Sequence, residues 1–354
     1  MPRQPAPEPT GTPEPTGTQE PVRASEPTGT PEPVRAPELS GRSSPADPTA
    51  VPAGTDPPDR RSPPSVPVSS ADPRRHGRWR VLALAVALVR AAHAGPAVAV
   101  TLFAGAYAAG AAGADAGRAV LVAVAVLAGQ LSVGWSNDWI DADRDLAVGR
   151  ADKPVVAGDL SPALLRRAAF VAAGACVVLS LALGPAAALL HVALVGVAWA
   201  YNARLKSTVW SWAPYAVAFG GLPSVATLGV PGGAGFAPWW VSAGGALLGV
   251  GAHLANVLPD LEDDAATGVR GLPHRLGRRG TAFGAAGVLL AAVLVVVLGP
   301  PGAPGAAGWA ALVVAAGLTG SAVVVALRRT TSRWPFTAAI LTAGLAVVLL
   351  VATG

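Results

Sequence analysis

Carboxylates gather at two places in the chain, each directly after an apolar segment. The first stretch, SNDWIDADRD (136–145), follows the run AVLVAVAVLAGQLSVGW, and the second, NVLPDLEDD (256–264), follows another apolar run. Ten acidic residues come after Asp115, and all of them lie in 138–159 or 260–264. Carboxylate oxygens in small numbers, with room left for water and phosphate oxygens, are the ligands that Mg²⁺ prefers. The two clusters therefore predict a magnesium site.

The two clusters share one spacing. Both contain an Asn, two Asp and a Gly at steps of four: Asn137, Asp141, Asp145 and Gly149, and 119 residues later Asn256, Asp260, Asp264 and Gly268. Steps of four keep side chains on one helix face, so each cluster presents a stripe of oxygen ligands. Carboxylates at a helix C-terminus oppose the helix dipole and repel one another, and a bound cation reverses both penalties. A solvated acidic loop is the alternative for either cluster alone.

The composition indicates that the clusters belong to a membrane protein. Hydrophobic residues make up 52% of the 354-residue chain, the mean hydropathy is +0.47, and apolar runs of 16 to 22 residues recur. The Lys and Arg residues that give the net charge of +5 are explained by the orientation of a membrane protein, so no nucleic-acid partner is expected. The single cysteine, Cys176, lies in an apolar run and excludes a disulfide framework or a CxxC metal site.

Residues 1–77 differ in amino-acid composition from the rest of the chain. EPTGTQEPVRA (14–24) returns as EPTGTPEPVRA (26–36), a 12-residue period rich in Pro, Thr, Gly and Glu. Such a segment has too little apolar surface to offset its conformational entropy, and its prolines disfavour helix and sheet. We predict a disordered N-terminal tail, followed by a basic cluster (74–80) that suits the cytoplasmic edge of a membrane helix.

Residues 78–354 are predicted to form an all-α, polytopic membrane domain. Its helices are expected to form two pseudo-repeated four-helix halves plus a final helix, because the two clusters repeat. Nine spans are predicted, each near the length that crosses about 30 Å of hydrocarbon, at 94–113, 119–137, 164–184, 186–201, 210–229, 238–258, 281–298, 306–327 and 335–353.

The basic residues predict the orientation of these spans. With the N-terminus in the cytoplasm, fourteen of the fifteen Lys and Arg residues after residue 93 lie on the cytoplasmic side, and Arg118 lies outside. This distribution satisfies the positive-inside rule. We therefore expect an integral protein of the bacterial plasma membrane, with its N-terminus and both acidic clusters at the cytoplasmic face.

The acidic motifs resemble those of a known family. NDWIDADRD fits NDxxDxxxD, and DLEDDAATGVRGLP resembles a second motif, DxxxD followed by G…LP, of the UbiA superfamily of intramembrane prenyltransferases. The resemblance covers about residues 80–354. It implies a UbiA-like transmembrane domain whose two motifs bind Mg²⁺ and an isoprenyl diphosphate. Carried over by position, the catalytic and metal residues are Asp138, Asp141, Asp145, Asp260 and Asp264, and Asn137 and Asn256 bind substrate.

Basic and aromatic groups near the motifs fit the same resemblance. GRADKPVVAG (149–158) looks like the family's loop after the first motif, and YNARLK (201–206) resembles its Tyr…Lys element. They imply substrate-binding roles for Arg150, Lys153, Tyr201 and Lys206. Such cations can neutralise charge on a leaving diphosphate, although cytoplasmic cations also serve as topology determinants.

The expected activity is Mg²⁺-dependent transfer of an isoprenyl group from an isoprenyl diphosphate to an acceptor, with an aromatic quinone-type or lipid precursor as the first choice of acceptor. One alternative is a UbiA-type terpene cyclase, which would use the same metal residues without an acceptor. A non-enzymatic cation transporter is the alternative from another class, and it predicts acids in mid-membrane. His191 and His253 lie within predicted spans and are interpreted as hydrogen-bonded packing residues, because no partnered His or Cys spacing surrounds them.

Overall fold

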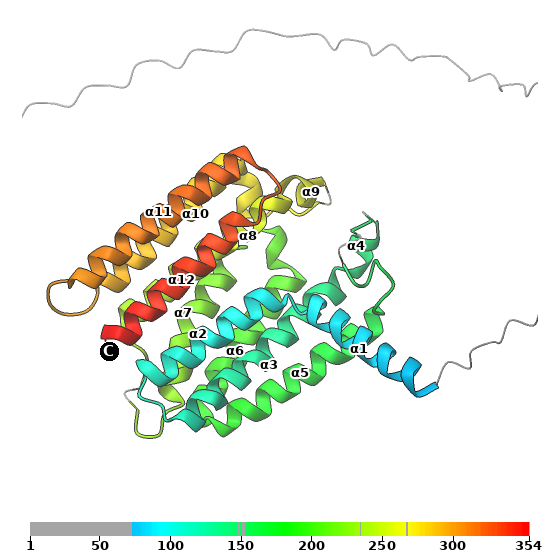
Figure 1. Cartoon of the computed structure of the whole chain (residues 1–354), viewed down its shortest axis with the longest axis horizontal. Helices are drawn as coiled ribbons and strands as arrows, with labels where there is room; N and C mark the ends of the chain where they lie inside the picture. Colours follow the sequence, from blue (N-terminus) through cyan, green and yellow to red (C-terminus); the bar gives the residue numbers. More distant parts are fainter. Residues whose placement is uncertain (1–72, 148, 151–152, 234, 267, 354) are drawn as a thin grey trace, which may run out of the picture. The chain divides into compact units, whose positions relative to one another are not determined.

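The chain forms an α-helical bundle, seen here in a computed structural model (Figure 1). The structure describes residues 73–147, 149–150, 153–233, 235–266 and 268–353, with side chains from residue 81 onward. Apart from residues 73–77, which lie in the first helix, the predicted disordered tail falls outside the described residues. Every regular element in the described residues is helical, which confirms the all-α prediction.

The described residues contain twelve α-helices and two short 3₁₀ helices. In chain order they are α1 Pro73–Ala91, α2 Ala94–Gly110, α3 Ala116–Ile140, α4 Ala142–Ala147, α5 Pro162–Ala182, α6 Pro185–Ala203, η1 Leu205–Ser207, α7 Ala213–Leu228, α8 Trp239–Val257, η2 Leu258–Asp260, α9 Leu261–Ala266, α10 Leu272–Leu298, α11 Ala306–Arg328 and α12 Trp334–Thr353.

Local sequence explains where several helices begin. The Asp115 side chain accepts a hydrogen bond from the Arg118 backbone N–H and so caps α3, and Ser161 caps α5 in the same way through Leu164. These side chains satisfy backbone donors that the first helical turn leaves without partners. Pro162 then occupies the first turn of α5, where its missing N–H costs nothing.

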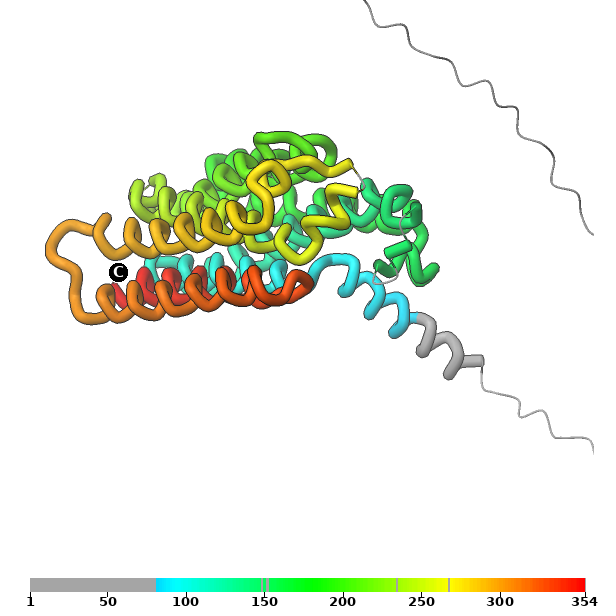
Figure 2. Tube along the Cα trace, turned by 90° about the horizontal axis from the view of Figure 1, so that it is seen from above, coloured from blue at the N-terminus to red at the C-terminus, as the bar shows by residue number. Residues whose placement is uncertain are grey.

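The helices pack as two similar halves. In the first half α3 packs against α2, α5 and α6, and in the second half α8 packs against α7 and α10, while α11 packs on α10. Contacts of α7 with α6 and α2 join the halves, and α12 packs against both α2 and α8. Figures 1 and 2 show the short helices α4 and α9, one from each half, at the bundle end opposite the C-terminus. This arrangement confirms the two pseudo-repeated halves and the final helix.

Two glycines permit close approaches that shape this end of the bundle. A Cβ on Gly134 of α3 would lie 2.7 Å from the Ala92 carbonyl oxygen, so α3 passes directly against the break between α1 and α2. A Cβ on Gly249 of α8 would lie 2.6 Å from the Tyr215 carbonyl oxygen of α7. Small residues at helix contacts let backbones approach in this way, as membrane bundles commonly do.

The count of nine spans is not confirmed. Within the described ranges, seven helices are long and apolar enough to cross a membrane: α3, α5, α6, α8 continued through α9, α10, α11 and α12. An eighth span results if α1 and α2, bent by 71° between residues 91 and 94, are taken as one broken span. The remaining prediction, 210–229, corresponds to α7, which has only 16 residues. The helix α10 begins at Leu272, five residues before its kink at Gly277, and therefore starts before the predicted span at 281.

Candidate active site

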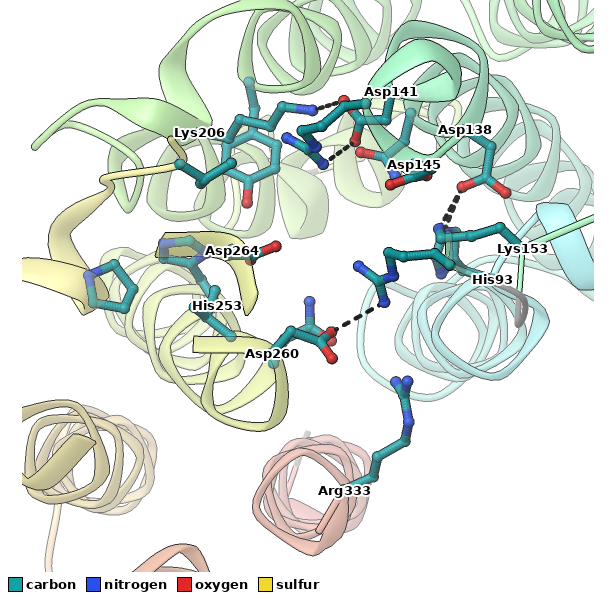
Figure 3. Close-up of a pocket in the computed structure, with 18 of the residues that line it drawn as sticks. His93, Asp138, Asp141, Asp145, Lys153, Lys206, His253, Asp260, Asp264 and Arg333 are labelled. Atoms are coloured by element: carbon teal, nitrogen blue, oxygen red, sulfur yellow. Dashed lines mark hydrogen bonds and ion pairs between the residues drawn. The ribbon is translucent and has the colours of Figure 1, made fainter. Parts of the chain in front are cut away.

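One cavity of about 230 Å³ lies where α3 and α8 end, and it brings side chains from both acidic motifs together (Figure 3). All eleven residues singled out in the sequence line it: Asn137, Asp138, Asp141, Asp145, Arg150, Lys153, Tyr201, Lys206, Asn256, Asp260 and Asp264. Residues more than 100 positions apart in the chain therefore face one space. Their individual roles stay predictions.

Both motifs end in the same backbone turn. Gly149 has φ +66° and Gly268 has φ +84°, a left-handed conformation that glycine adopts without strain. After each glycine a backbone N–H returns to an aspartate carbonyl: Arg150 N to Asp145 O at 3.1 Å, and Val269 N to Asp264 O at 2.9 Å. These six-to-one bonds are characteristic of Schellman caps, which terminate α4 and α9. The repeated glycine of each motif is thus a helix stop.

Asp138 is buried at the end of α3 and contacts two basic side chains from other segments of the chain. Lys153 Nζ donates to Asp138 Oδ1 at 2.7 Å, and His93 Nε2 lies 3.2 Å from the same oxygen. Lys153 comes from the loop after α4, and His93 sits at the break between α1 and α2 with φ +52°. This left-handed conformation is uncommon for a residue with a side chain, and it turns His93 into the site.

Asp141 caps α3 and is also paired twice. Its Oδ1 accepts a short hydrogen bond from Lys206 Nζ, and its Oδ2 accepts one from Arg144 at 2.9 Å. Burial lowers the pKa of the Lys206 ammonium below its ordinary value, while Asp141 opposes that shift. Burial raises the pKa of the Asp145 carboxyl; Lys153 opposes this rise and Asp141 adds to it. The first motif is thus a buried cluster of paired charges.

The second motif is more open. Asp260 lies 3.6 Å from Arg150, a residue of the first half, and Asp264 lies 3.9 Å from His274 Nε2 at the start of α10. The side chains of Asp260 and Asp264 are 29% and 21% exposed. Figure 3 shows Asp260 and Asp264 across the cavity from Asp138 and Asp145, so the two motifs form facing walls.

Sequence reasoning did not select several residues that line the cavity, among them His93, Arg144, His253, His274 and Arg333. Arg144 carried a usable signal, because it stands three residues after Asp141 on the same helical face. His93 carried none, because its approach depends on the bend between α1 and α2. Arg333 comes from the segment before α12, which only the tertiary fold brings to this end.

Two tyrosine rings pack around His253, and of these Tyr201 also lines the cavity. Tyr201 meets Tyr215 edge to face at a centroid distance of 5.1 Å, and Tyr215 stacks on His253 at 4.7 Å. His253 Nε2 lies 3.0 Å from Ser211 Oγ, so the interpretation of His253 as hydrogen-bonded agrees with the structure. His191, by contrast, lies within the first half and bonds Ser180 at 2.8 Å.

The donor set fits Mg²⁺ in chemistry but is not gathered around one point. Among the described residues five aspartates and six Lys or Arg side chains line the cavity. No group of three Asp, Glu, His or Cys side chains in the described ranges is placed to hold one ion. The carboxylates instead bind Lys153, Lys206, Arg144 and Arg150. Metal binding therefore requires that some of these ion pairs exchange.

Comparisons with known proteins agree with this geometry. The model of the UbiA prenyltransferase family matches residues 98–352. A UbiA homologue from Aeropyrum pernix K1 has a TM-score of 0.60 and 17% identity, and covers 73% of this chain and 98% of its own. A UbiA homologue from Archaeoglobus fulgidus, bound to GPP and Mg²⁺, has a TM-score of 0.58 and 15% identity, covering 75% and 98%.

A digeranylgeranylglyceryl phosphate synthase also has this fold, with a TM-score of 0.55, 14% identity, and coverage of 76% of this chain and 98% of its own. No curated protein matches the chain in sequence. At these identities the solved structures show the fold alone, whereas the match to the family model shows family membership.

Proposed function

The chain belongs to the UbiA prenyltransferase family, and from that premise we propose that it transfers an isoprenyl group from an isoprenyl diphosphate to a hydrophobic acceptor within the membrane. The observation that carries this proposal is the convergence of both aspartate motifs and three basic loop residues on one cavity. Carboxylates and cations facing one space are the two kinds of group that a metal-bound diphosphate needs.

In this proposal Asp138, Asp141, Asp145, Asp260 and Asp264 hold Mg²⁺, which when bound supplies positive charge to the leaving diphosphate. The Archaeoglobus fulgidus homologue, bound to GPP and Mg²⁺, supports the choice of metal and of an isoprenyl diphosphate. Arg150, Lys153 and Lys206 bind diphosphate oxygens, and Asn137 and Asn256 position them. Each of these cations exchanges its carboxylate for a phosphate oxygen, a partner with which it forms strong charge-assisted hydrogen bonds.

The interior of the bundle suits a hydrocarbon chain. A second cavity of about 90 Å³ is lined by apolar side chains of α2, α7, α8, α10 and α12, including Phe103, Phe219 and Leu248. Phe219 stacks at 6.2 Å on Tyr215, whose ring also stacks on His253 in the polar cavity. A dry, apolar interior keeps water from the allylic cation, which would otherwise be hydrolysed.

The apolar helices and the family together indicate an integral membrane protein. We further propose the bacterial plasma membrane, with the N-terminus and the cavity mouth in the cytoplasm. The distribution of Lys and Arg supports this orientation, because only Arg118 would lie outside. Arg118 follows α2 near the start of α3, at the end opposite the acidic motifs.

The acceptor class is the finer part of the proposal: an aromatic quinone-type or lipid precursor. The test is a screen of membranes containing the full chain, in which several isoprenyl diphosphates are crossed with several acceptors and products are identified by lipid mass spectrometry. A prenylated acceptor supports transfer, a cyclic hydrocarbon formed without acceptor supports a terpene cyclase, and no product with any pair refutes both.

Matched substitutions test the site in the same screen. Asp141→Asn should abolish product formation, since it removes a carboxylate from the cavity wall. Asp143→Asn removes an exposed carboxylate two residues away that does not line the cavity, and should leave product formation intact. Equal product formation by the two variants would show that this cavity is not the active site.

A further inference from the structure

His253 carries a buried ring nitrogen that lacks a hydrogen-bond partner. The residue is 1% exposed and lines the polar cavity. Its Nε2 lies 3.0 Å from Ser211 Oγ, but its Nδ1 has no partner in the described part of the chain. A buried polar atom without a partner is destabilising, and in native proteins it calls for a specific explanation.

The ring is held firmly in this position. Ser211 Oγ accepts a hydrogen bond from the Leu272 backbone N–H at 3.1 Å, which anchors the hydroxyl that faces Nε2. Tyr215 stacks on the ring with an interplanar angle of 30°, and Tyr201 contacts it edge-on at 5.7 Å. When Nε2–H donates to Ser211, the lone pair of Nδ1 is left for a donor. In this tautomer Nδ1 is an ordered hydrogen-bond acceptor.

The position of His253 along α8 separates it from the groups assigned to the diphosphate. His253 precedes Asn256 by three residues and Asp260 by seven, which places it about 4.5 Å and about 10 Å deeper along the helix axis, respectively. Its immediate neighbours are two tyrosines and a serine, and His274 is the nearby titratable group. The polar end of an isoprenyl diphosphate is the diphosphate itself, so a polar partner at this depth comes from a second molecule.

Resting on the function proposed above, we propose that Nδ1 of His253 accepts a hydrogen bond from a hydroxyl group of the prenyl acceptor. His253 is then a specificity-determining residue for hydroxyl-bearing acceptors. A cyclase reaction would bring only hydrocarbon to this depth and would leave Nδ1 without a partner. The site thus favours transfer to an acceptor over cyclisation.

Two substitutions at His253 separate the roles of its two nitrogens. The amide of His253→Gln reaches the place of Nε2 and retains the Ser211 contact, but nothing replaces Nδ1. The amide of His253→Asn lies near the place of Nδ1 and loses the Ser211 contact. His191→Gln is the matched control, because His191 is a buried histidine bonded to Ser180 outside the cavity.

The assay uses the full chain in lipid vesicles with geranylgeranyl diphosphate and Mg²⁺. The acceptors are 4-hydroxybenzoate, homogentisate and dihydroxynaphthoate, each paired with its analogue lacking the hydroxyl. We expect His253→Gln to raise the acceptor KM about tenfold, as the loss of one buried hydrogen bond does, while His253→Asn and His191→Gln stay within about threefold. Pyrophosphate release without acceptor should not change in any variant.

A binding measurement complements the kinetics. With inorganic pyrophosphate and Mg²⁺ present, the hydroxylated acceptor should raise the Tm of the wild type and of His253→Asn, but not of His253→Gln. An unchanged acceptor KM and Tm shift in His253→Gln, or equal use of the analogues by the wild type, overturns the inference and leaves the proposed function standing. A wild type that prenylates no acceptor refutes the proposed function, and the inference with it.

Discussion

The two acidic motifs share their spacing and their glycine caps, yet they differ in how their charges are satisfied. The side chains of Asp138 and Asp141 are 2% and 8% exposed, and each is bound by two basic side chains. The side chains of Asp260 and Asp264 are 29% and 21% exposed; Asp260 lies 3.6 Å from Arg150, and Asp264 lies 3.9 Å from the His274 ring. The first motif is closed and paired, and the second is open.

The internal repeat explains this difference. At the offset of 119 residues, Arg144, Arg150 and Lys153 of the first half correspond to Asp263, Val269 and Leu272 of the second. At this offset Asp141 and Asp145 recur as Asp260 and Asp264. Asp138, however, corresponds to Val257, and the three bases have no basic counterpart in the second half. Arg150 even reaches across to Asp260. We infer that the first half supplies the cations for the diphosphate.

Removing one carboxylate from either motif should have the largest effect on activity, and it tests whether both motifs are needed for prenyl transfer. Asp138→Asn and Asp260→Asn should each lower kcat/KM for prenyl transfer at least about 100-fold, because both remove a carboxylate that stabilises charge on the leaving group. Radiolabelled prenyl transfer in vesicles measures this loss. Asp263→Asn, an exposed neighbour of Asp264 outside the cavity, is the control and should stay near wild-type activity.

The loss of folding free energy should be larger for a substitution in the first motif than for one in the second. Asp138→Asn leaves the largely buried Lys153 ammonium without its carboxylate and should cost about 3 kcal/mol of folding free energy. Asp264→Asn removes a more exposed carboxylate and should cost less than about 1 kcal/mol. Thermal unfolding of the purified variants in detergent measures both. Equal losses of Tm would show that the first motif is not more tightly paired than the second.

Metal binding should depend on pH through one aspartate of each motif, because burial raises the pKa of both Asp145 and Asp264. The raised pKa of Asp145 means that its carboxyl takes up a proton at a higher pH than an ordinary aspartate does. Because Mg²⁺ binds the charged form, its affinity should weaken as the pH falls toward that pKa, and strengthen as the pH rises. Calorimetric titration at several pH values measures this. Asp145→Asn should bind more weakly with a flatter pH profile, whereas Asp260→Asn should keep the slope.

Replacing the glycine that caps each motif should have the smallest effect, a modest loss of stability, and it tests whether the two caps are equivalent. Gly149→Ala and Gly268→Ala each place a side chain on a residue with positive φ, which costs about 1 kcal/mol. The two variants should lose Tm to a similar extent. Gly174→Ala, at a helical glycine with open space around it, is the control and should be neutral or slightly stabilising. A loss at only one of Gly149 and Gly268 would break the equivalence of the two caps.

The repeated spacing selected six of the eleven predicted site residues, because steps of four fix one face of a helix without tertiary information: Asn137, Asp141, Asp145, Asn256, Asp260 and Asp264. The resemblance to a known family implied the other five. Span counting was less successful. The window of apolar residues at 210–229 does not show that α7 ends at 16 residues, and 94–113 does not show the 71° bend before α2. Both depend on neighbouring helices and caps.

The sequence by itself determined the helical class, the two halves and the oxygen-rich motifs, because apolar length and four-residue spacing are local properties of a chain. The tertiary structure alone decided which cation meets which carboxylate. Lys206 reaches Asp141 from 65 residues away, and His93 reaches Asp138 through a backbone turn at φ +52°. Such pairs depend on the crossing of separate helices, which no single segment specifies.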